Sequence, residues 1–365
     1  MPDLLLLTPD FPPRQGGVAK YLHAFATSFR DRILVIAEPD PDGKFFDQHA
    51  GYLIRRETLS YRFFWPSWFK SVRILMRESG GAKMIFVSHV LPFGTAAFVA
   101  GWVTGKPYVV FAHGMDIGLA SRTPWKRFLT RIVLRGARGV VTNSIFLEKE
   151  IRERFGVDRI QVSYPCLQEK KIPAAFLLRK QDGGCRFLTV SRLVERKGHL
   201  RVLEALALLR ERGVAQNIRY RIIGEGPMLG AIRKRIEELR LSDIVRLESG
   251  ISDADRERAY ASSDVFVMPT MPKPEDREGF GLVYIEAAAF GVPSLATRHH
   301  GVDEAVLDGE TGLLIPDGDI HALAGAMARV AADPAFRETL GRNAFARAHA
   351  KFTCAIQHEA IKKFL

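Results

Sequence analysis

The sequence predicts an α/β protein made of two doubly wound domains. Its 365 residues are too many for one ordinary core and suit two. Short apolar runs rich in β-formers alternate with longer segments of helical period, which is the pattern of parallel sheets covered by helices. A polar stretch containing Gly183 and Gly184 interrupts the alternation once, after which it starts again.

The expected elements fall into two series. In the first half, strands are expected at residues 4–7, 33–37, 84–87, 108–112, 140–142 and 160–163, and helices at 18–29, 93–103 and 145–155. In the second half, strands are expected at residues 187–190, 220–223, 244–247, 265–268, 294–296 and 313–315. The helices expected there are 197–212, 228–240, 252–261, 281–290 and 320–332.

These series define the expected domain boundaries. We expect an N-terminal domain at residues 1–170, a linker at 171–185, a C-terminal domain at 186–350, and a C-terminal helix at 351–365 that packs back on the first domain. Parallel sheets bind ligands beyond the carboxyl ends of their strands, so two such halves predict a ligand cleft between them.

The net charge of +12 lies entirely in the first half, where residues 1–180 hold 27 Lys and Arg against 15 Asp and Glu. A solubilising role, attraction to an anionic membrane and attraction to nucleic acid all fit this excess. Residues 61–77 mix aromatic residues with Lys70, Arg73 and Arg77 at helical spacing. That segment is either an interfacial helix or a core-facing helix with a basic solvent face, and the charge favours membrane contact.

Cysteines are few and odd in number: Cys166, Cys185 and Cys354. No pair has metal-ligand spacing, so we expect a reducing compartment and no disulfide framework. The first residues lack a basic leader, and no apolar stretch is long enough for a confident membrane span. A cytoplasmic location, at most peripheral on the inner face of the plasma membrane, is expected.

Glu278 and Glu286 flank the start of an apolar helix that is preceded by Gly279 and Gly281. Glycines allow a ligand to approach the backbone closely, and the free N–H groups and dipole of a helix start favour a diphosphate. Glu286 lies in a run of buried character, where a carboxylate needs a partner. The spacing therefore indicates two carboxylates that grip hydroxyl groups on either side of an anion.

The segment Glu278-Gly-Phe-Gly-Leu-Val-Tyr-Ile-Glu286 resembles the Glu-x7-Glu motif of family 4 glycosyltransferases. The resemblance implies the GT-B fold, with two Rossmann-like domains facing a central cleft, and transfer of a sugar with retention of its anomeric configuration. It implies that Glu278 contacts the transferred sugar and that Glu286 holds the nucleotide ribose. The backbone of Phe280, Gly281 and Leu282 would approach the sugar and phosphate.

Other motifs extend the resemblance along the chain. Ser191-Arg192-Leu-Val-Glu-Arg-Lys197-Gly198 is similar to the family's diphosphate clamp, and Arg192 and Lys197 can both reach one anion. Gly224-Glu-Gly226-Pro227 fails the dinucleotide fingerprint, because its third glycine comes one residue late, and instead resembles the turn beside the donor. Ile251 would lie by the nucleotide base.

In the first half, Asp10-Phe-Pro-Pro-Arg-Gln-Gly16-Gly17 resembles the family's glycine loop, which contacts donor phosphate or acceptor. The resemblance implies that His113, which follows a strand, contacts the transferred sugar, with Asp116 a weaker candidate. It also implies that the first domain binds the acceptor and the second the nucleotide sugar. Asn143 and Ser144 are assigned only a place near the ligand. The sequence of this loop is most similar to that in bacterial phosphatidylinositol-mannoside-type mannosyltransferases.

Three Asp-x-Asp pairs occur at 40–42, 253–255 and 317–319, and each fits turn or N-cap chemistry rather than a metal site. We expect no metal and no other cofactor. The expected partners are a GDP- or UDP-sugar as donor and a glycolipid or glycan as acceptor. The resemblance favours GDP-mannose as the donor. Two alternatives remain: a nucleotide-sugar 2-epimerase of the same fold, and a basic nucleic-acid-binding protein, for which no recognised module is found.

Overall fold

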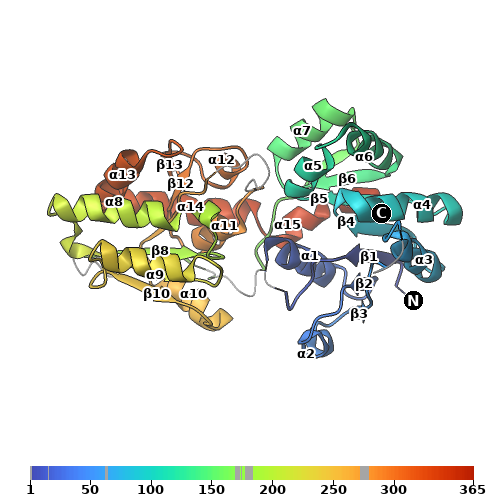
Figure 1. Cartoon of the computed structure of the whole chain (residues 1–365), viewed down its shortest axis with the longest axis horizontal. Coiled ribbons are helices and arrows are strands. Elements are labelled where there is room, and N and C mark those ends of the chain that lie inside the picture. The colour runs from blue at the N-terminus through green and yellow to red at the C-terminus, as the bar shows by residue number, and fades with distance from the viewer. Residues whose placement is uncertain are drawn as a thin grey trace. The chain divides into compact units, whose positions relative to one another are not determined.

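The structure, a computed structural model, describes residues 2–14, 16–61, 65–168, 173, 175–176, 184–271 and 279–365. The chain forms two compact units. Unit 1 comprises Met1–Gln168 together with Cys354–Leu365, and unit 2 comprises Glu169–Thr353. The chain thus crosses between the units twice, and its last residues return to unit 1. Figure 1 shows the elements of both units.

Unit 1 holds a parallel sheet in the order β3-β2-β1-β4-β5-β6-β7. Its strands are β1 (Leu4–Thr8), β2 (Ile33–Ala37), β3 (Leu53–Arg56), β4 (Met84–Ser88), β5 (Tyr108–Ala112), β6 (Gly139–Thr142) and β7 (Ile160–Val162). Its helices are α1 (Gly17–Ser28), α2 (Gly43–His49), α3 (Phe69–Glu78), η1 (Val90–Gly94), α4 (Thr95–Thr104), α5 (Met115–Ala120), α6 (Pro124–Gly136), α7 (Ile145–Phe155), α15 (Cys354–Glu359) and η5 (Lys362–Phe364).

Alternate side chains of the strands feed two cores in unit 1. One face, with Leu5 and Val87, packs against α3, α4, α6 and α7. The other face, with Leu6 and Phe111, packs against α1 and the C-terminal segment, of which Ile361 is fully buried. This arrangement is a sheet with helices on both faces, as the alternating pattern of the sequence predicts.

Unit 2 holds a second parallel sheet in the order β10-β9-β8-β11-β12-β13. Its strands are β8 (Cys185–Val190), β9 (Ile218–Ile223), β10 (Val245–Glu248), β11 (Val265–Met268), β12 (Ser294–Thr297) and β13 (Gly312–Ile315). Its helices are η3 (Glu195–Lys197), α8 (His199–Glu211), η4 (Ala215–Asn217), α9 (Leu229–Glu238), α10 (Asp253–Ala261), α11 (Leu282–Ala289), α12 (Val302–Ala305), α13 (Ile320–Ala332) and α14 (Pro334–Lys351).

The core of unit 2 also has two sides. Helices α8, α9 and α13 cover one face of the sheet. On the other face, Tyr260 of α10 and Tyr284 of α11 contact Phe266 of β11, with ring centroids 6.2 and 5.7 Å away. The functional motif around Glu286 is therefore attached to the core by its own helix.

The structure pairs Cys166 with Cys354 in a disulfide, and the expectation of no disulfide is wrong. The two cysteines are 188 residues apart, so their spacing in the sequence carries no sign of the pair. They meet because the C-terminal segment returns to unit 1 beside the end of its sheet. Cys185 is free and buried in β8, and burial raises its pKa to about 12.

The basic segment at residues 61–77 forms α3 from Phe69 onward, and residues 62–64 lie outside the described part. Val72 and Leu75 are buried in the core, so the apolar face of this helix packs inward. Arg77 pairs with Glu57 and Glu78. The core-facing alternative describes the side of α3 that carries Val72 and Leu75, while Phe69 and Met76 are partly exposed.

Candidate active site

In unit 2 the candidate donor residues follow the two central strands. The order of the sheet reverses between β8 and β11, and the crevice beyond such a reversal is where doubly wound sheets bind ligands. Ser191–Gly198 follows β8, and residues 279–286 lead from the region after β11 into α11. The sequence placed the first motif at a strand end and the second at a helix start, and the topology makes β8 and β11, the strands before them, neighbours.

The turn at Gly224 packs directly against the loop after β8. Leu193 N donates to Glu225 O at 2.7 Å, and Ser191 N donates to Ile223 O at 3.1 Å. A Cβ on Gly224 would lie 1.8 Å from Ser191 O, and one on Gly226 would lie 2.5 Å from Leu193 O. Glycine is needed here for close backbone approach, and the structure brings these two predicted motifs together.

The two predicted cations differ in their surroundings. Arg192 is exposed two residues beyond β8, whereas Lys197 is 8% exposed at the end of η3. Gly198 follows with a positive φ of 72°, and a Cβ there would meet Pro269 O at 2.1 Å. Lys197 is thus fixed at the mouth of α8 by a backbone contact with the segment after β11.

Glu286 has a defined partner. Tyr260 of α10 donates its hydroxyl proton to Glu286 Oε2 at 2.9 Å, and Glu286 is half-buried on α11. Burial and the neighbouring carboxylate raise the pKa of Tyr260, which keeps the phenol protonated as a donor. The bond orients the Glu286 carboxylate on α11.

The start of α11 is built on Gly281, which caps the helix with φ 87° and ψ 73°. Phe280 is buried and its ring lies 5.4 Å from that of Phe352, so its side chain belongs to the core. Leu282 is the first residue of the helix. Glu278 lies outside the described residues. Ile251 is half-buried in the loop between β10 and α10.

In unit 1 the corresponding reversal lies between β1 and β4. His113, after β5, is held on several sides. Its backbone N donates to Asp116 Oδ1 at 2.9 Å, its carbonyl accepts from Asn143 Nδ2 at 3.3 Å, and its Nε2 contacts Ser88 Oγ at 3.1 Å. Asp116 Oδ2 also accepts from Val90 N at 3.2 Å, so this carboxylate ties two strand-end loops together.

Burial lowers the pKa of His113 to about 4, with Asp116 opposing and His89 assisting the shift. The imidazole is therefore neutral near pH 7. A neutral imidazole can exchange hydrogen bonds with a sugar hydroxyl without carrying a charge.

Sequence reasoning missed the network beside His113. Ser88 Oγ contacts both His113 Nε2 and His89 Nδ1, the latter at 2.9 Å, and His89 Nε2 lies 3.4 Å from Asp10 Oδ2. His89 has a positive φ of 73°, which is strained for a residue with a side chain. Asp10, His89 and His113 follow the adjacent strands β1, β4 and β5, and their places after those strands were the available signal.

Gly16 and Gly17 start α1, and their setting differs from that of Gly224. A Cβ added to either glycine would meet nothing within 4 Å, and Gly16 is extended with φ 165°. Neither packing against the described residues nor backbone conformation requires glycine at these positions. A role in keeping space for a ligand is consistent with both observations.

The Asp-x-Asp pairs serve local structure. Asp319 caps α13 by accepting from Ala322 N at 2.7 Å, and Asp317 pairs with Arg201. Asp255 accepts from the hydroxyl of the N-cap Ser252 at 2.6 Å. Within the described residues, one cluster has metal-ligand geometry, formed by Cys166, Cys354 and His358. In the same part of the chain, every helix is too short or too polar to cross a membrane.

The sequence of this chain matches two protein-family models. Residues 15–168 match the family described as Glycosyltransferase Family 4, and residues 175–347 match Glycosyl transferases group 1. The fold and the motifs define a two-domain glycosyltransferase of the GT-B class. The chain belongs to the family 4 glycosyltransferases.

Similar proteins include a GDP-mannose-dependent alpha-(1-6)-phosphatidylinositol monomannoside mannosyltransferase from Mycolicibacterium smegmatis. It is 30% identical over 93% of this chain and 91% of its own length. A GDP-mannose-dependent monoacylated alpha-(1-6)-phosphatidylinositol monomannoside mannosyltransferase from Corynebacterium glutamicum is also similar. It is 26% identical over 99% of this chain and 97% of its own length.

Among solved structures, Anabaena Alr3699/HepE in complex with UDP has a TM-score of 0.80 at 19% identity. The alignment covers 99% of this chain and 98% of the other. A glycosyltransferase from Rickettsia africae has a TM-score of 0.83 at 16% identity, over 100% and 98% of the two chains. These similarities show the fold.

Proposed function

We propose that this glycosyltransferase moves a hexose, namely mannose from GDP-mannose, to a lipid-linked or glycan acceptor, with retention and without a metal. The observation that carries the proposal is the hydrogen bond from Tyr260 of α10 to Glu286 of α11, the helix that Gly281 caps. The similarity over nearly the whole length to a GDP-mannose-dependent enzyme supports the choice of donor. UDP-sugars are the next candidates.

In the proposed chemistry, Arg192 and Lys197 neutralise the charge that grows on the leaving nucleoside diphosphate. Glu286 holds the ribose, and Glu278 with His113 holds the hexose. The acceptor oxygen attacks from the face that the diphosphate leaves, and a phosphate oxygen takes the acceptor's proton. Catalysis then depends on positioning and on leaving-group stabilisation, with no side-chain nucleophile.

The first test is binding. Thermal unfolding is measured with GDP, UDP and their mannose, glucose and N-acetylglucosamine derivatives, because a ligand that binds the folded state raises its stability by mass action. We expect GDP-mannose to stabilise most and to be consumed only with acceptor present. Formation of a new sugar nucleotide from donor alone would favour the epimerase. Binding of a random oligonucleotide without donor binding would favour the nucleic-acid alternative.

The second test is mutational. Lys197→Ala and Glu286→Ala are expected to lower transfer by about 100-fold each while the fold survives, since each removes one charge-assisted contact to the donor. The matched controls are Lys234→Ala and Glu237→Ala on α9, which change exposed side chains of the same type. Near-normal turnover in the first pair would contradict the assigned roles, as would equal losses in the controls.

A membrane-bound acceptor requires a surface that meets the membrane. The corner of α5 and α6, where α6 begins, exposes Trp125 and Phe128, whose ring centroids lie 5.9 Å apart, with Lys126 and Arg127 between them in the sequence. Aromatic rings with cations suit an anionic bilayer interface. This corner, rather than the apolar face of α3, is our candidate for peripheral attachment at the cytoplasmic face. Loss of sedimentation with anionic vesicles in Trp125→Ala/Phe128→Ala, against Trp65→Ala as control, would support it.

A further inference from the structure

The disulfide between Cys166 and Cys354 stands at both connections between the units. Unit 1 gives way to unit 2 after Gln168, two residues beyond Cys166, and unit 2 ends at Thr353, one residue before Cys354. The bond therefore closes a loop that contains the whole of unit 2. Both connections leave unit 1 from one covalent point.

The C-terminal segment does not depend on this bond for its place. Tyr164 N donates to Gln357 Oε1 at 2.7 Å, and Ser163 Oγ donates to Gln357 O at 3.1 Å. Further along, Arg138 Nε donates to Phe364 O at 3.1 Å. Opening the disulfide would release the covalent link while these hydrogen bonds still hold α15 on unit 1.

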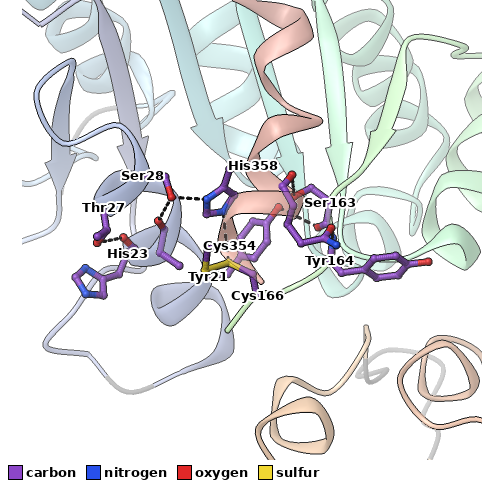
Figure 2. Close-up of a disulfide and its surroundings, with 11 residues drawn as sticks. Tyr21, His23, Thr27, Ser28, Ser163, Tyr164, Cys166, Cys354 and His358 are labelled. Atoms are coloured by element: carbon purple, nitrogen blue, oxygen red, sulfur yellow. Dashed lines mark hydrogen bonds between the residues drawn. A yellow bond between two sulfur atoms is a disulfide. The ribbon is translucent and has the colours of Figure 1, made fainter. Parts of the chain in front are cut away.

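A histidine faces the disulfide, as Figure 2 shows. His358 Nε2 lies 3.6 Å from Cys166 Sγ, and its Nδ1 lies 2.7 Å from Ser28 Oγ on α1. Because His358 is buried, its pKa is lowered to about 4 and the ring is neutral. Ser28 Oγ also lies 3.3 Å from Ala24 O, and we assign its single proton to the shorter contact with Nδ1. With this assignment the ring proton is on Nε2 and faces the sulfur of Cys166.

The two cysteine residues differ in exposure. Cys354 is half-buried, whereas Cys166 is 8% exposed and lies beside the buried His358. We therefore expect an incoming thiolate to attack the more exposed residue, Cys354, with Cys166 as the leaving group. The Nε2–H of His358 is placed to donate to the thiolate that forms there, and hydrogen bonds to charged groups are stronger than those to neutral ones.

We propose that Cys166, Cys354 and His358 form a thiol–disulfide exchange site through which a dithiol reductant controls the covalent link between the two connections. One thiolate of the reductant attacks Cys354 Sγ and the Cys166–Cys354 bond breaks, so that Cys166 leaves as a thiolate hydrogen-bonded to His358. The second thiol of the reductant attacks the mixed disulfide and releases Cys354. The reductant becomes a cyclic disulfide, and each cysteine thiolate takes a proton from solvent.

The consequence for the enzyme rests on the proposed function. The donor contacts assigned to Arg192, Lys197 and Glu286 all lie in unit 2, whose internal structure the bond does not touch. Turnover also needs His113, which belongs to unit 1. It therefore depends on the two connections that join unit 1 to unit 2. Reduction is therefore expected to leave nucleotide affinity unchanged and to lower turnover severalfold, and reoxidation is expected to restore it.

The experiment uses the full-length Cys185→Ser variant, so that the two cysteines of the site are the only thiols. The folded protein is equilibrated in buffers of reduced and oxidised dithiothreitol, quenched with a maleimide and weighed. Two labels on the reduced protein and none on the oxidised one are expected, with reversible conversion. A bond that stays closed in excess dithiol under native conditions would overturn the proposal, and so would an opened bond with unchanged turnover.

Variants of His358 test the positioning of the leaving thiolate. His358→Leu should slow opening about tenfold, the loss of a hydrogen bond to a charged group, and His358→Gln should recover part of the rate through its amide N–H. The exposed His321→Leu is the matched control. Equal opening rates in all of these variants would remove His358 from the mechanism.

Zinc analysis of the reduced protein separates exchange from metal binding, because the three ligand atoms lie within 4.8 Å of one another. One zinc retained per chain would overturn the exchange role in favour of a metal site. A chain that turns over no nucleotide sugar even when oxidised would contradict the proposed function, while the count of labels still decides the exchange site.

Discussion

At the scale of single residues, Gly16 and Gly224 stand in opposite surroundings although both belong to predicted ligand loops. A Cβ on Gly224 would collide with Ser191 O at 1.8 Å, whereas one on Gly16 would meet nothing within 4 Å. The first glycine is required by the fold of the loop. The second is required by nothing in its described surroundings, which fits the contact with a ligand that we propose for this loop.

We therefore predict different outcomes for two alanine variants. Gly224→Ala should lower the free energy of unfolding of unit 2 by about 3 kcal/mol through overpacking. Gly16→Ala should unfold at the same urea concentration as the parent and yet lose at least about tenfold in turnover, because a misplaced substrate reacts slowly. Urea denaturation and the transfer assay decide between them. An active Gly16→Ala would remove this loop from the proposed site.

The residue scale also shows the limits of the sequence. The pattern predicted that Glu286 needs a partner but could not name Tyr260, which comes from another helix and depends on how α10 packs on α11. Likewise His113 was found from its place after a strand, whereas Ser88 and His89 were missed because a motif search does not report side chains from neighbouring strands. Long-range contacts of this kind follow from the order of the sheet.

At the scale of elements, most periodic segments were predicted, with the amphipathic helix α6 (Pro124–Gly136) an exception, and several atypical segments were missed. The strands at 33–37, 108–112 and 265–268 agree with the structure to the residue. Edge strand β3 was missed because its sequence, Leu-Ile-Arg-Arg, is half charged and its outer side is solvated. Helix α14 was missed because its buried positions include Gly341, Ala344 and Ala348, which give little apolar period, although Asp333 and Pro334 mark its start.

The small residues of α14 have a structural purpose that can be tested. A Cβ on Gly341 would lie 2.4 Å from Gly291 O, so this helix touches the backbone just after α11. Gly341→Ala is expected to push α14 away and to cost about 1–3 kcal/mol. Gly325→Ala in α13 is the control, because a Cβ there has open space and should stabilise the helix by about 0.5–1 kcal/mol. Similar unfolding midpoints for both variants would contradict the close approach.

At the scale of the whole molecule, the two units share one plan and differ in charge. Each is a parallel sheet whose candidate residues follow strands on either side of a reversal in strand order. The sequence predicted this duplication because the alternation of apolar runs restarts after the polar segment. The excess of positive charge lies in the first half of the chain, which supplies most of unit 1 and the exposed corner of α5 and α6.

Buried histidines make the stability of both units depend on pH. Burial lowers the pKa values of His113, His199 and His358 to about 4, below the value of about 6.5 expected in the unfolded chain. Between these two pKa values the three histidines are protonated in the unfolded chain and neutral in the folded chain. These three histidines therefore cost no free energy of unfolding above about pH 6.5. As the pH drops toward 4, the free energy of unfolding falls by up to about 1.4 kcal/mol per pH unit for each histidine.

His113 and His358 belong to unit 1, and His199 belongs to unit 2. Between pH 6.5 and pH 5 we therefore predict that unit 1 loses about twice as much stability as unit 2, in a range above that in which paired carboxylates titrate. Urea denaturation at several pH values, followed by hydrogen exchange in each unit, measures the two slopes. His358→Asn should flatten the slope of unit 1 by about half, and the exposed His321→Asn should change neither. Equal slopes in both units would show that only one of the two histidines of unit 1 is held neutral by the fold, and a flat slope in unit 1 would show that neither is.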